Sequence, residues 1–185
     1  MNIVQPAAPP LSPELVAAFR DIVGDKYAVT DAADIAPYLT EERGLFHGRS
    51  PLVLRPGSTA EVAAICKLAT EHRIALVPQG GNTGLVGGQT AHHGEVVISL
   101  RRLDKIREID AASNTMTCEA GVVLQIAQQK AAEADRLFRC RSAPKEAAPS
   151  AAISPPMPAA PARSPMAWRA KWRWGSKWCW RMAAS

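Results

Sequence analysis

The stretch that decides the fold is Pro78-Gln79-Gly80-Gly81-Asn82-Thr83-Gly84-Leu85-Val86-Gly87-Gly88-Gln89-Thr90. Five glycines fall within nine residues of it, directly after an apolar run at 74–78. Because glycine adopts positive φ freely and lets other groups approach closely, such a run can point successive N–H groups into one concavity. A concavity of that kind suits a phosphate or pyrophosphate. A flexible surface loop is the alternative explanation of the glycine content taken alone.

The glycine spacing excludes two common nucleotide-binding motifs. A P-loop ends in glycine, lysine and serine or threonine, and 78–90 contains no lysine. The Rossmann fingerprint needs G-x-G-x-x-G running into a helix, and no frame of this loop has that spacing.

The flanking residues predict the element order β-α-β-loop-β-β-β-α. Ser58 or Thr59 is placed to cap the first helix of this series, and Glu61 is placed as the capping-box partner of Ser58. The order indicates an α+β fold with a βαβ unit at its front. The predicted elements are strands at 52–55, 74–78, 96–100, 106–110 and 115–120, with helices at 59–73 and 122–138.

Ahead of this region, residues 13–24 predict a short amphipathic helix capped by Ser12. The acidic stretch 30–38 predicts a loop with one helical turn at most. Cys66 on a helix face and Cys118 in a strand predict buried, reduced thiols. With no secretory signal or membrane-spanning run in the sequence, we expect a cytoplasmic protein.

Two pairs of polar residues near the loop predict no site. His92 and His93 are adjacent, so in a strand they would point to opposite faces, and we expect a solvated turn and no metal site. Arg101 and Arg102 follow the strand at 96–100, and we expect a solvated strand end.

Several separated motifs resemble one known family in their order. They are RPGS at 55–58, PQGGNTGLVGG at 78–88, VVISL at 96–100, IREID at 106–110 and AGVVL at 120–124. From about Tyr38 to Phe138 the chain resembles the FAD-linked oxidase family, which has a vanillyl-alcohol-oxidase or p-cresol-methylhydroxylase (PCMH) type of FAD-binding domain. The form of the glycine loop is closest to the D-lactate, glycolate and D-2-hydroxyglutarate dehydrogenases of that family.

The resemblance implies FAD as the cofactor, with the glycine loop around its pyrophosphate. It implies the first subdomain of a PCMH-type domain, and an enzyme that oxidises a small D-2-hydroxy acid to a 2-oxo acid, with no nucleic-acid or membrane partner. The family's catalytic residues and metal ligands belong to later parts of the fold, so none is assigned here. The implied cofactor contacts are Gly80, Gly81, Asn82, Thr83, Gly84, Gly88 and Gln89, with the side chains of Asn82 and Thr83 as further donors.

Residues 139–185 have a different chemistry from the rest. They hold nine basic residues, one acidic residue and all five tryptophans, whereas 1–138 hold thirteen basic and sixteen acidic residues. We expect disorder over 139–165 and a short helix within 166–182. The predicted organisation is a helical lead-in at 1–46, a truncated FAD-binding part at 47–138 and a disordered basic tail at 139–185.

The tail also has an explanation at the level of the gene. If each codon starts one base earlier, the tail can encode a segment containing GSCTIGGN, which resembles a later FAD-contacting segment of the family. Met157-Pro158 must then give alanine, and Trp174-Gly175 must give glycine. We therefore expect a frameshift near Phe138, which leaves this chain an inactive fragment. The alternative is a non-enzymatic basic polypeptide that acts through a Trp/Arg/Lys-rich tail on nucleic acid or membranes.

Overall fold

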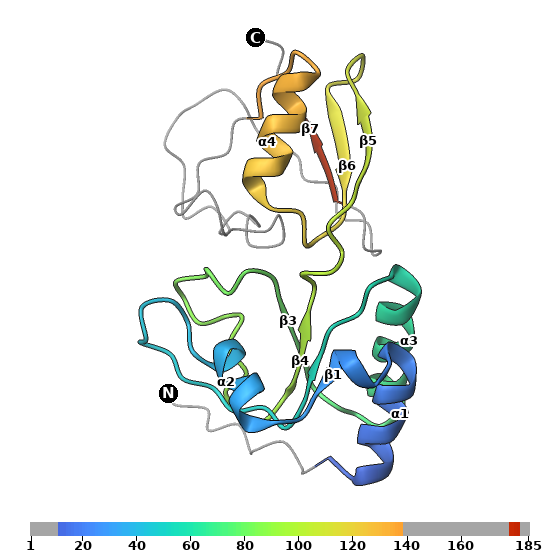
Figure 1. The fold of residues 1–185 in the computed structure, drawn as a ribbon, viewed down its shortest axis with the longest axis vertical. Helices are drawn as coiled ribbons and strands as arrows, with labels where there is room; N and C mark the ends of the chain where they lie inside the picture. The colour runs from blue at the N-terminus through green and yellow to red at the C-terminus, as the bar shows by residue number, and fades with distance from the viewer. Residues whose placement is uncertain (1–10, 139–177, 182–185) are drawn as a thin grey trace. The chain divides into compact units, whose positions relative to one another are not determined.

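The computed structural model describes residues 11–138 and the backbone of 178–181. The chain divides into two compact units, Met1–Leu103 and Asp104–Ser185 (Figure 1). The segment boundaries predicted at 46/47 and 138/139 stay predictions.

A four-stranded sheet forms the centre of the first unit. Its strand order is β1-β2-β4-β3, in which β2, β4 and β3 run parallel and β1 is antiparallel to β2. The helix α3 (Thr59–Glu71) connects β2 to β3, so the predicted βαβ unit is confirmed. The strands are β1 (Ala28–Val29), β2 (Val53–Leu54), β3 (Leu76–Gln79) and β4 (Val96–Ser99).

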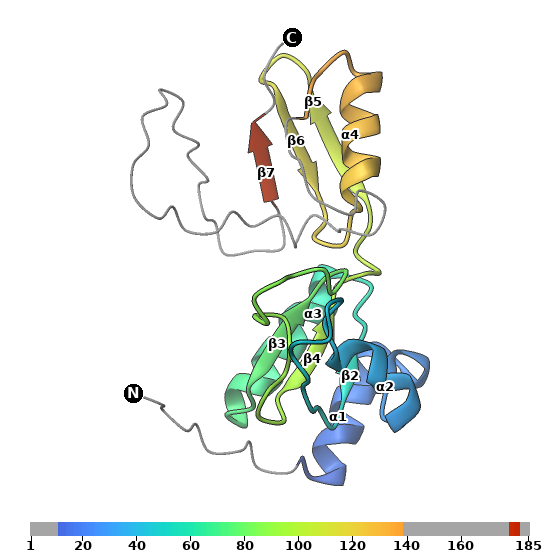
Figure 2. The same cartoon turned by 90° about the vertical axis from the view of Figure 1, so that its left-hand side faces the viewer.

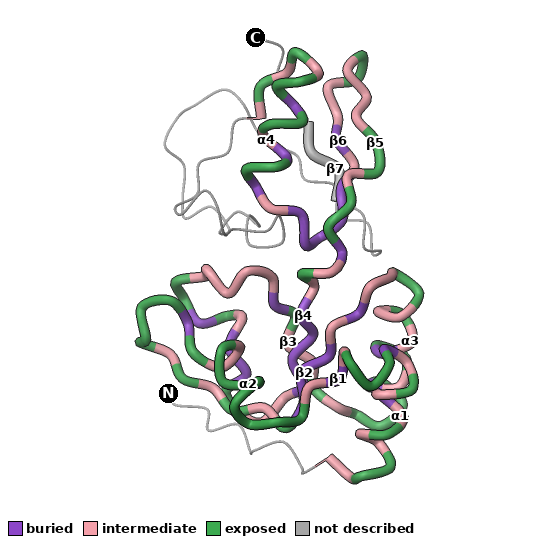
Figure 3. The backbone as a smooth tube through the Cα atoms, viewed as in Figure 1, coloured by how far each residue is buried: buried purple, intermediate pink, exposed green. Residues whose placement is uncertain are grey.

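Both faces of this sheet are covered. Leu54 and Ile98 pack against α3 and α1 (Pro13–Val23) on one face. Val53 and Val97 pack against α2 (Ala32–Leu39) on the other face. A strand buried on both sides has no polar alternation, which explains the continuous apolar runs of the sequence. Figure 3 shows the resulting band of buried backbone along β2 and β4.

Local signals account for the helix ends of α1 and α3. Ser12 accepts a hydrogen bond from the N–H of Leu15, and Gly24 ends α1, as predicted. The Ser58 hydroxyl accepts a hydrogen bond from the N–H of Glu61, and the Glu61 carboxylate accepts one from the N–H of Gly57. The capping box is therefore present, but its second bond comes from Gly57, the residue before the cap.

The expectation of a loop at 30–38 is wrong, because this stretch forms α2. Asp31 caps it by accepting from the N–H groups of Ala33 and Asp34. Ile35 is buried under the helix, at 3% exposure. Pro37 lies inside the helix, where proline is unfavourable, but packing against the sheet outweighs local propensity here.

The second unit begins with the predicted hairpin of β5 (Ile106–Asp110) and β6 (Thr115–Cys118). Asp110 holds the turn by accepting from two backbone N–H groups. The helix α4 (Leu124–Glu133) lies beside the hairpin in Figure 2. Its Ala127 and Ala131 share a buried core with Met116 of β6. The remaining helical turn is the 3-10 segment η1 (Asp25–Tyr27) of the first unit.

Two sequence expectations need correction in these elements. Residues 178–181 form β7 (Trp178–Arg181), antiparallel to β6, where a helix was expected. Cys66 is exposed on α3, whereas Cys118 is buried as predicted. The disorder expected at 139–165 lies outside the described residues.

The core of the first unit gives a direct stability test. Leu54→Ala should lower the free energy of unfolding by about 2–5 kcal/mol, because the fully buried side chain lies between two helices and the sheet. Leu45→Ala is the matched control, since that side chain is 67% exposed and should change it by less than about 0.5 kcal/mol. Urea denaturation followed by circular dichroism measures both. Equal effects of the two substitutions would contradict this core.

Candidate functional site

The glycine loop, defined here as residues 80–90, leaves β3 at the carboxyl ends of the parallel strands. Ligands of open α/β sheets commonly bind at this edge. Residues 80–84 are half-buried, and Leu85 and Val86 form an exposed tip. The loop therefore stands at an edge where its backbone can meet a ligand.

Arg101, at the end of β4, orients the first two peptides of the loop. Its Nε donates to the carbonyl of Gly80 and its terminal nitrogen to that of Gly81, both at 3.2 Å. The C=O and the next N–H of a trans peptide point in opposite directions. The N–H groups of Gly81 and Asn82 therefore point away from Arg101. The expectation that Arg101 is merely solvated is wrong.

Two amide side chains anchor the start of the loop to α2. Gln79 is 1% exposed and donates from Nε2 to the carbonyls of Tyr38 and Gln89, at 2.8 and 3.1 Å. Asn82 has φ +62° and donates from Nδ2 to the carbonyl of Thr40 at 2.7 Å. The amide nitrogen of Asn82 thus caps the end of α2, and the expected donation from Asn82 to a ligand stays a prediction.

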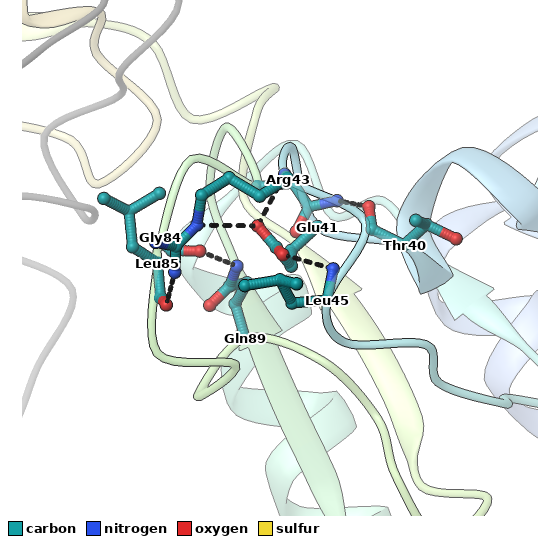
Figure 4. A network of polar contacts seen from close by, with 8 residues as sticks. Thr40, Glu41, Arg43, Leu45, Gly84, Leu85 and Gln89 are labelled. Atoms are coloured by element: carbon teal, nitrogen blue, oxygen red, sulfur yellow. Dashed lines mark hydrogen bonds and ion pairs between the residues drawn. The ribbon is translucent and has the colours of Figure 1, made fainter.

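The far half of the loop is held by two further side chains, as Figure 4 shows. Gln89 donates from Nε2 to the carbonyl of Gly84 at 2.7 Å, which brings residues 88–89 back to residues 80–84. Arg43, on the segment that follows α2, donates to the carbonyl of Leu85. In both bonds a carbonyl of the loop is taken up by a side chain of the chain itself, as in the bonds from Arg101.

Glu41 is the buried anion that supports Arg43. Its side chain is 2% exposed and accepts from the N–H groups of Arg43 and Leu45, both at 2.8 Å. Its carboxylate also lies 4.0 Å from Nε of Arg43. The bond from the Arg43 N–H is the main cause that lowers the pKa of Glu41, and it outweighs the raising effect of burial. Glu41 therefore stays ionised and keeps the 41–45 turn closed.

Two loop glycines differ in what surrounds them. Gly87 has φ +73°, and a Cβ placed on it would lie 2.8 Å from the ring of Phe46. A Cβ on Gly88 would meet no protein atom within 4 Å. The fold itself therefore requires glycine at position 87, whereas the space next to the Cα of Gly88 holds no protein atoms.

In this loop the carbonyls of Gly80, Gly81, Gly84 and Leu85 accept hydrogen bonds from side chains, whereas most of the N–H groups have no partner. Within 11–138 and 178–181, the N–H groups of residues 80–84, 88 and 89 have no hydrogen-bond partner. Such a set of unpaired backbone donors, unobstructed by side chains, fits a pyrophosphate. The fold brings both groups of predicted contact residues together. These residues are Gly80, Gly81, Asn82, Thr83, Gly84, Gly88 and Gln89.

Sequence reasoning missed the anchors Arg101, Glu41 and Arg43. Nothing in the local sequence shows which distant carbonyl an arginine meets. One signal of a tight turn was available at 41–44. There an acidic and a basic residue lie two positions apart, and a glycine follows them.

Comparison with known proteins places the chain in a family. Residues 50–148 match the family described as FAD binding domain. The chain belongs to this family. The match continues beyond Phe138, and FAD is the cofactor for which the family is named.

The most similar curated relatives carry related names. A probable mitochondrial D-2-hydroxyglutarate dehydrogenase of Oryza sativa is 43% identical over 120 residues, covering 65% of this chain and 22% of the relative. A D-2-hydroxyglutarate–pyruvate transhydrogenase of Saccharomyces cerevisiae is 37% identical over 130 residues, covering 69% and 26%. This FAD-binding chain thus spans about a quarter of the length of the curated relatives it matches. The resemblance to D-2-hydroxyacid dehydrogenases is confirmed.

Solved structures confirm the fold of this FAD-binding part. Alkyldihydroxyacetonephosphate synthase superposes with a TM-score of 0.67 at 18% identity, over 79% of this chain and 34% of that protein. p-Cresol methylhydroxylase superposes with a TM-score of 0.62 at 20% identity, over 71% and 27%. The predicted α+β, PCMH-type fold is therefore correct.

Two searches of the described residues found no further kind of site. No group of three or more His, Cys, Asp or Glu side chains there is placed to hold a metal ion. In that same part of the chain, no helix has the length and apolar character needed to cross a membrane.

The lowered pKa of Glu41 predicts a local dependence on pH. The carboxylate stabilises the 41–45 turn above its ordinary pKa of 4.5, and this contribution is lost as pH falls below that value. Hydrogen exchange should show the N–H groups of Arg43 and Leu45 losing protection as the pH falls below 4.5, while that of Val97 in β4 keeps it. Glu41→Gln should remove this pH dependence. A persisting pH dependence in that variant would show that another group controls the turn.

Proposed function

We propose that the glycine loop is the pyrophosphate subsite of an FAD site. The observation that supports this is a difference in hydrogen bonding between the carbonyl groups and the N–H groups of the loop backbone. The carbonyls of Gly80, Gly81, Gly84 and Leu85 accept bonds from the protein's own side chains, and the N–H groups of the predicted contact residues stay free. An anion completes such a set without displacing any internal bond.

We further propose that the parent enzyme oxidises a small D-2-hydroxy acid to the 2-oxo acid. The names of the curated relatives support this substrate class. FAD held by this loop would supply the redox chemistry of such an oxidation. The residues described here contribute binding and orientation, because Arg101, Gln79 and Asn82 hold the loop in shape before the cofactor arrives. No catalytic residue is assigned among them.

A cytoplasmic location is also a proposal. Cys66, on α3, is an exposed free thiol, which suits a reducing compartment. Fractionation of cells that express the tagged protein tests it, and recovery with an organelle would contradict it.

Gly88→Ala tests the pyrophosphate subsite without disturbing the fold. Its Cβ meets no protein atom and needs no unusual φ, so the free energy of unfolding should change by less than about 1 kcal/mol. The same Cβ would occupy the space above a free N–H group. The dissociation constant for ADP should therefore rise at least about tenfold, as measured by calorimetry. Unchanged ADP binding by a stable variant would exclude Gly88 from the subsite.

The proposed frameshift after Phe138 has its own test. We expect the chain as written to bind FAD weakly and to lack activity, because a pyrophosphate contact alone leaves both ring systems of FAD in water. A chain encoded with one base restored at that codon should purify yellow and oxidise D-lactate or D-2-hydroxyglutarate. Yellow protein from the chain as written would contradict the proposal. Retention of that chain on nucleic acid would favour the alternative of a basic binding polypeptide.

A further inference from the structure

A cleft of about 390 Å³ opens beside the glycine loop, within the first unit. Its volume lies within the range of small-molecule sites, about 300–1,000 Å³. Basic side chains reach it from three separate elements: Lys26 from η1, Arg55 from the end of β2 and Arg101 from the end of β4. α2 contributes Tyr38 and the single acidic residue, Asp34.

Arg55 lines this cleft with a side-chain nitrogen that lacks a hydrogen-bond acceptor among the described residues. Its Nε is fully buried and has no hydrogen-bond partner among the described residues. A buried guanidinium N–H without an acceptor is costly, and it is stabilised when an anion supplies one. The backbone of Arg55 is fully engaged, because its N–H donates to Tyr27 and its carbonyl accepts from Arg102. The backbone of Arg55 is therefore satisfied within the protein, and its buried Nε is the atom that lacks an acceptor among the described residues.

Through Arg101 the cleft meets the carbonyl side of the first two peptides of the loop, and not the side to which the N–H groups of Gly81 and Asn82 point. Arg101 lines the cleft and donates to the carbonyls of Gly80 and Gly81. The following N–H groups point the other way across each peptide plane. A group bound to Arg55 in the cleft therefore differs from the pyrophosphate proposed for the N–H groups.

We propose that this cleft binds the phosphate group of a small hydroxylated ligand. Three basic side chains and one carboxylate leave a local charge of +2, which a phosphate monoester of nearly two negative charges balances. An arginine is suited to phosphate because its planar fork donates two parallel hydrogen bonds. Asp34 would oppose a bare anion, but it can accept a hydrogen bond from a hydroxyl group of the same ligand. The ligand is separate from the proposed FAD.

Calorimetry on the full chain tests the site with two probes, inorganic phosphate and ribose 5-phosphate. Arg55→Gln should weaken binding of both at least about tenfold, because one charge-assisted bond is removed. Lys67→Gln is the matched control, since it removes the same charge from an exposed position on α3. Asp34→Asn should weaken ribose 5-phosphate more than inorganic phosphate. Thermal melting of each variant shows that it remains folded.

Competition separates this site from the proposed cofactor site. Saturating ADP should leave the dissociation constant of ribose 5-phosphate unchanged, and Gly88→Ala should weaken ADP without affecting ribose 5-phosphate. Equal binding by Arg55→Gln and the unaltered chain would overturn the proposal. Displacement of ribose 5-phosphate by ADP would also overturn it, because the cleft would then belong to the cofactor. Failure of ADP to bind, with phosphate binding intact, would instead contradict only the proposed function.

Discussion

The C=O and N–H of a peptide group lie on opposite sides, and this constraint decides what the glycine loop can do. Each carbonyl that bonds to Arg101, Gln89 or Arg43 turns the following N–H outwards. Among the predicted cofactor contacts, the N–H groups of Gly81 and Asn82 are thus oriented by bonds made behind them. Glycine loses more conformational freedom on ordering than any other residue. Because these side chains order the loop during folding, less of that cost remains at binding.

The doubly covered sheet gives the loop a stable base. Its strands alternate between a face packed on α1 and α3 and a face packed on α2. On β3 the alternation that buries Val77 on the α2 face also brings Gln79 to that face, where it reaches the carbonyl of Tyr38. α2 therefore has two roles, since it covers the sheet and supplies the backbone to which the loop is tied. The strand register that places Val77 in the core therefore also places Gln79, which anchors the loop.

Much of this arrangement could be predicted from the sequence, because its signals are local. The cap at Ser58, the apolar strands and the hairpin each depend on a few neighbouring residues. α2 could not be predicted in the same way, because Ile35 signals a helix only when the sheet face it covers is known. Arg101 looked like a solvated strand end, since its partners lie at the end of another strand. Composition identified the loop glycines, but their anchors depend on three-dimensional contacts far apart in the chain.

The partners of the loop come from both sides of it in the sequence. Tyr38, Thr40 and Arg43 precede it, and Arg101 follows it by more than a strand's length. During synthesis the loop therefore emerges as an unrestrained glycine-rich segment, with only its upstream partners available. Its anion-binding form is completed when β4 has paired between β2 and β3 and has carried Arg101 into place. A nascent chain gains the capacity to capture a nucleotide late, in the same step that closes its central sheet.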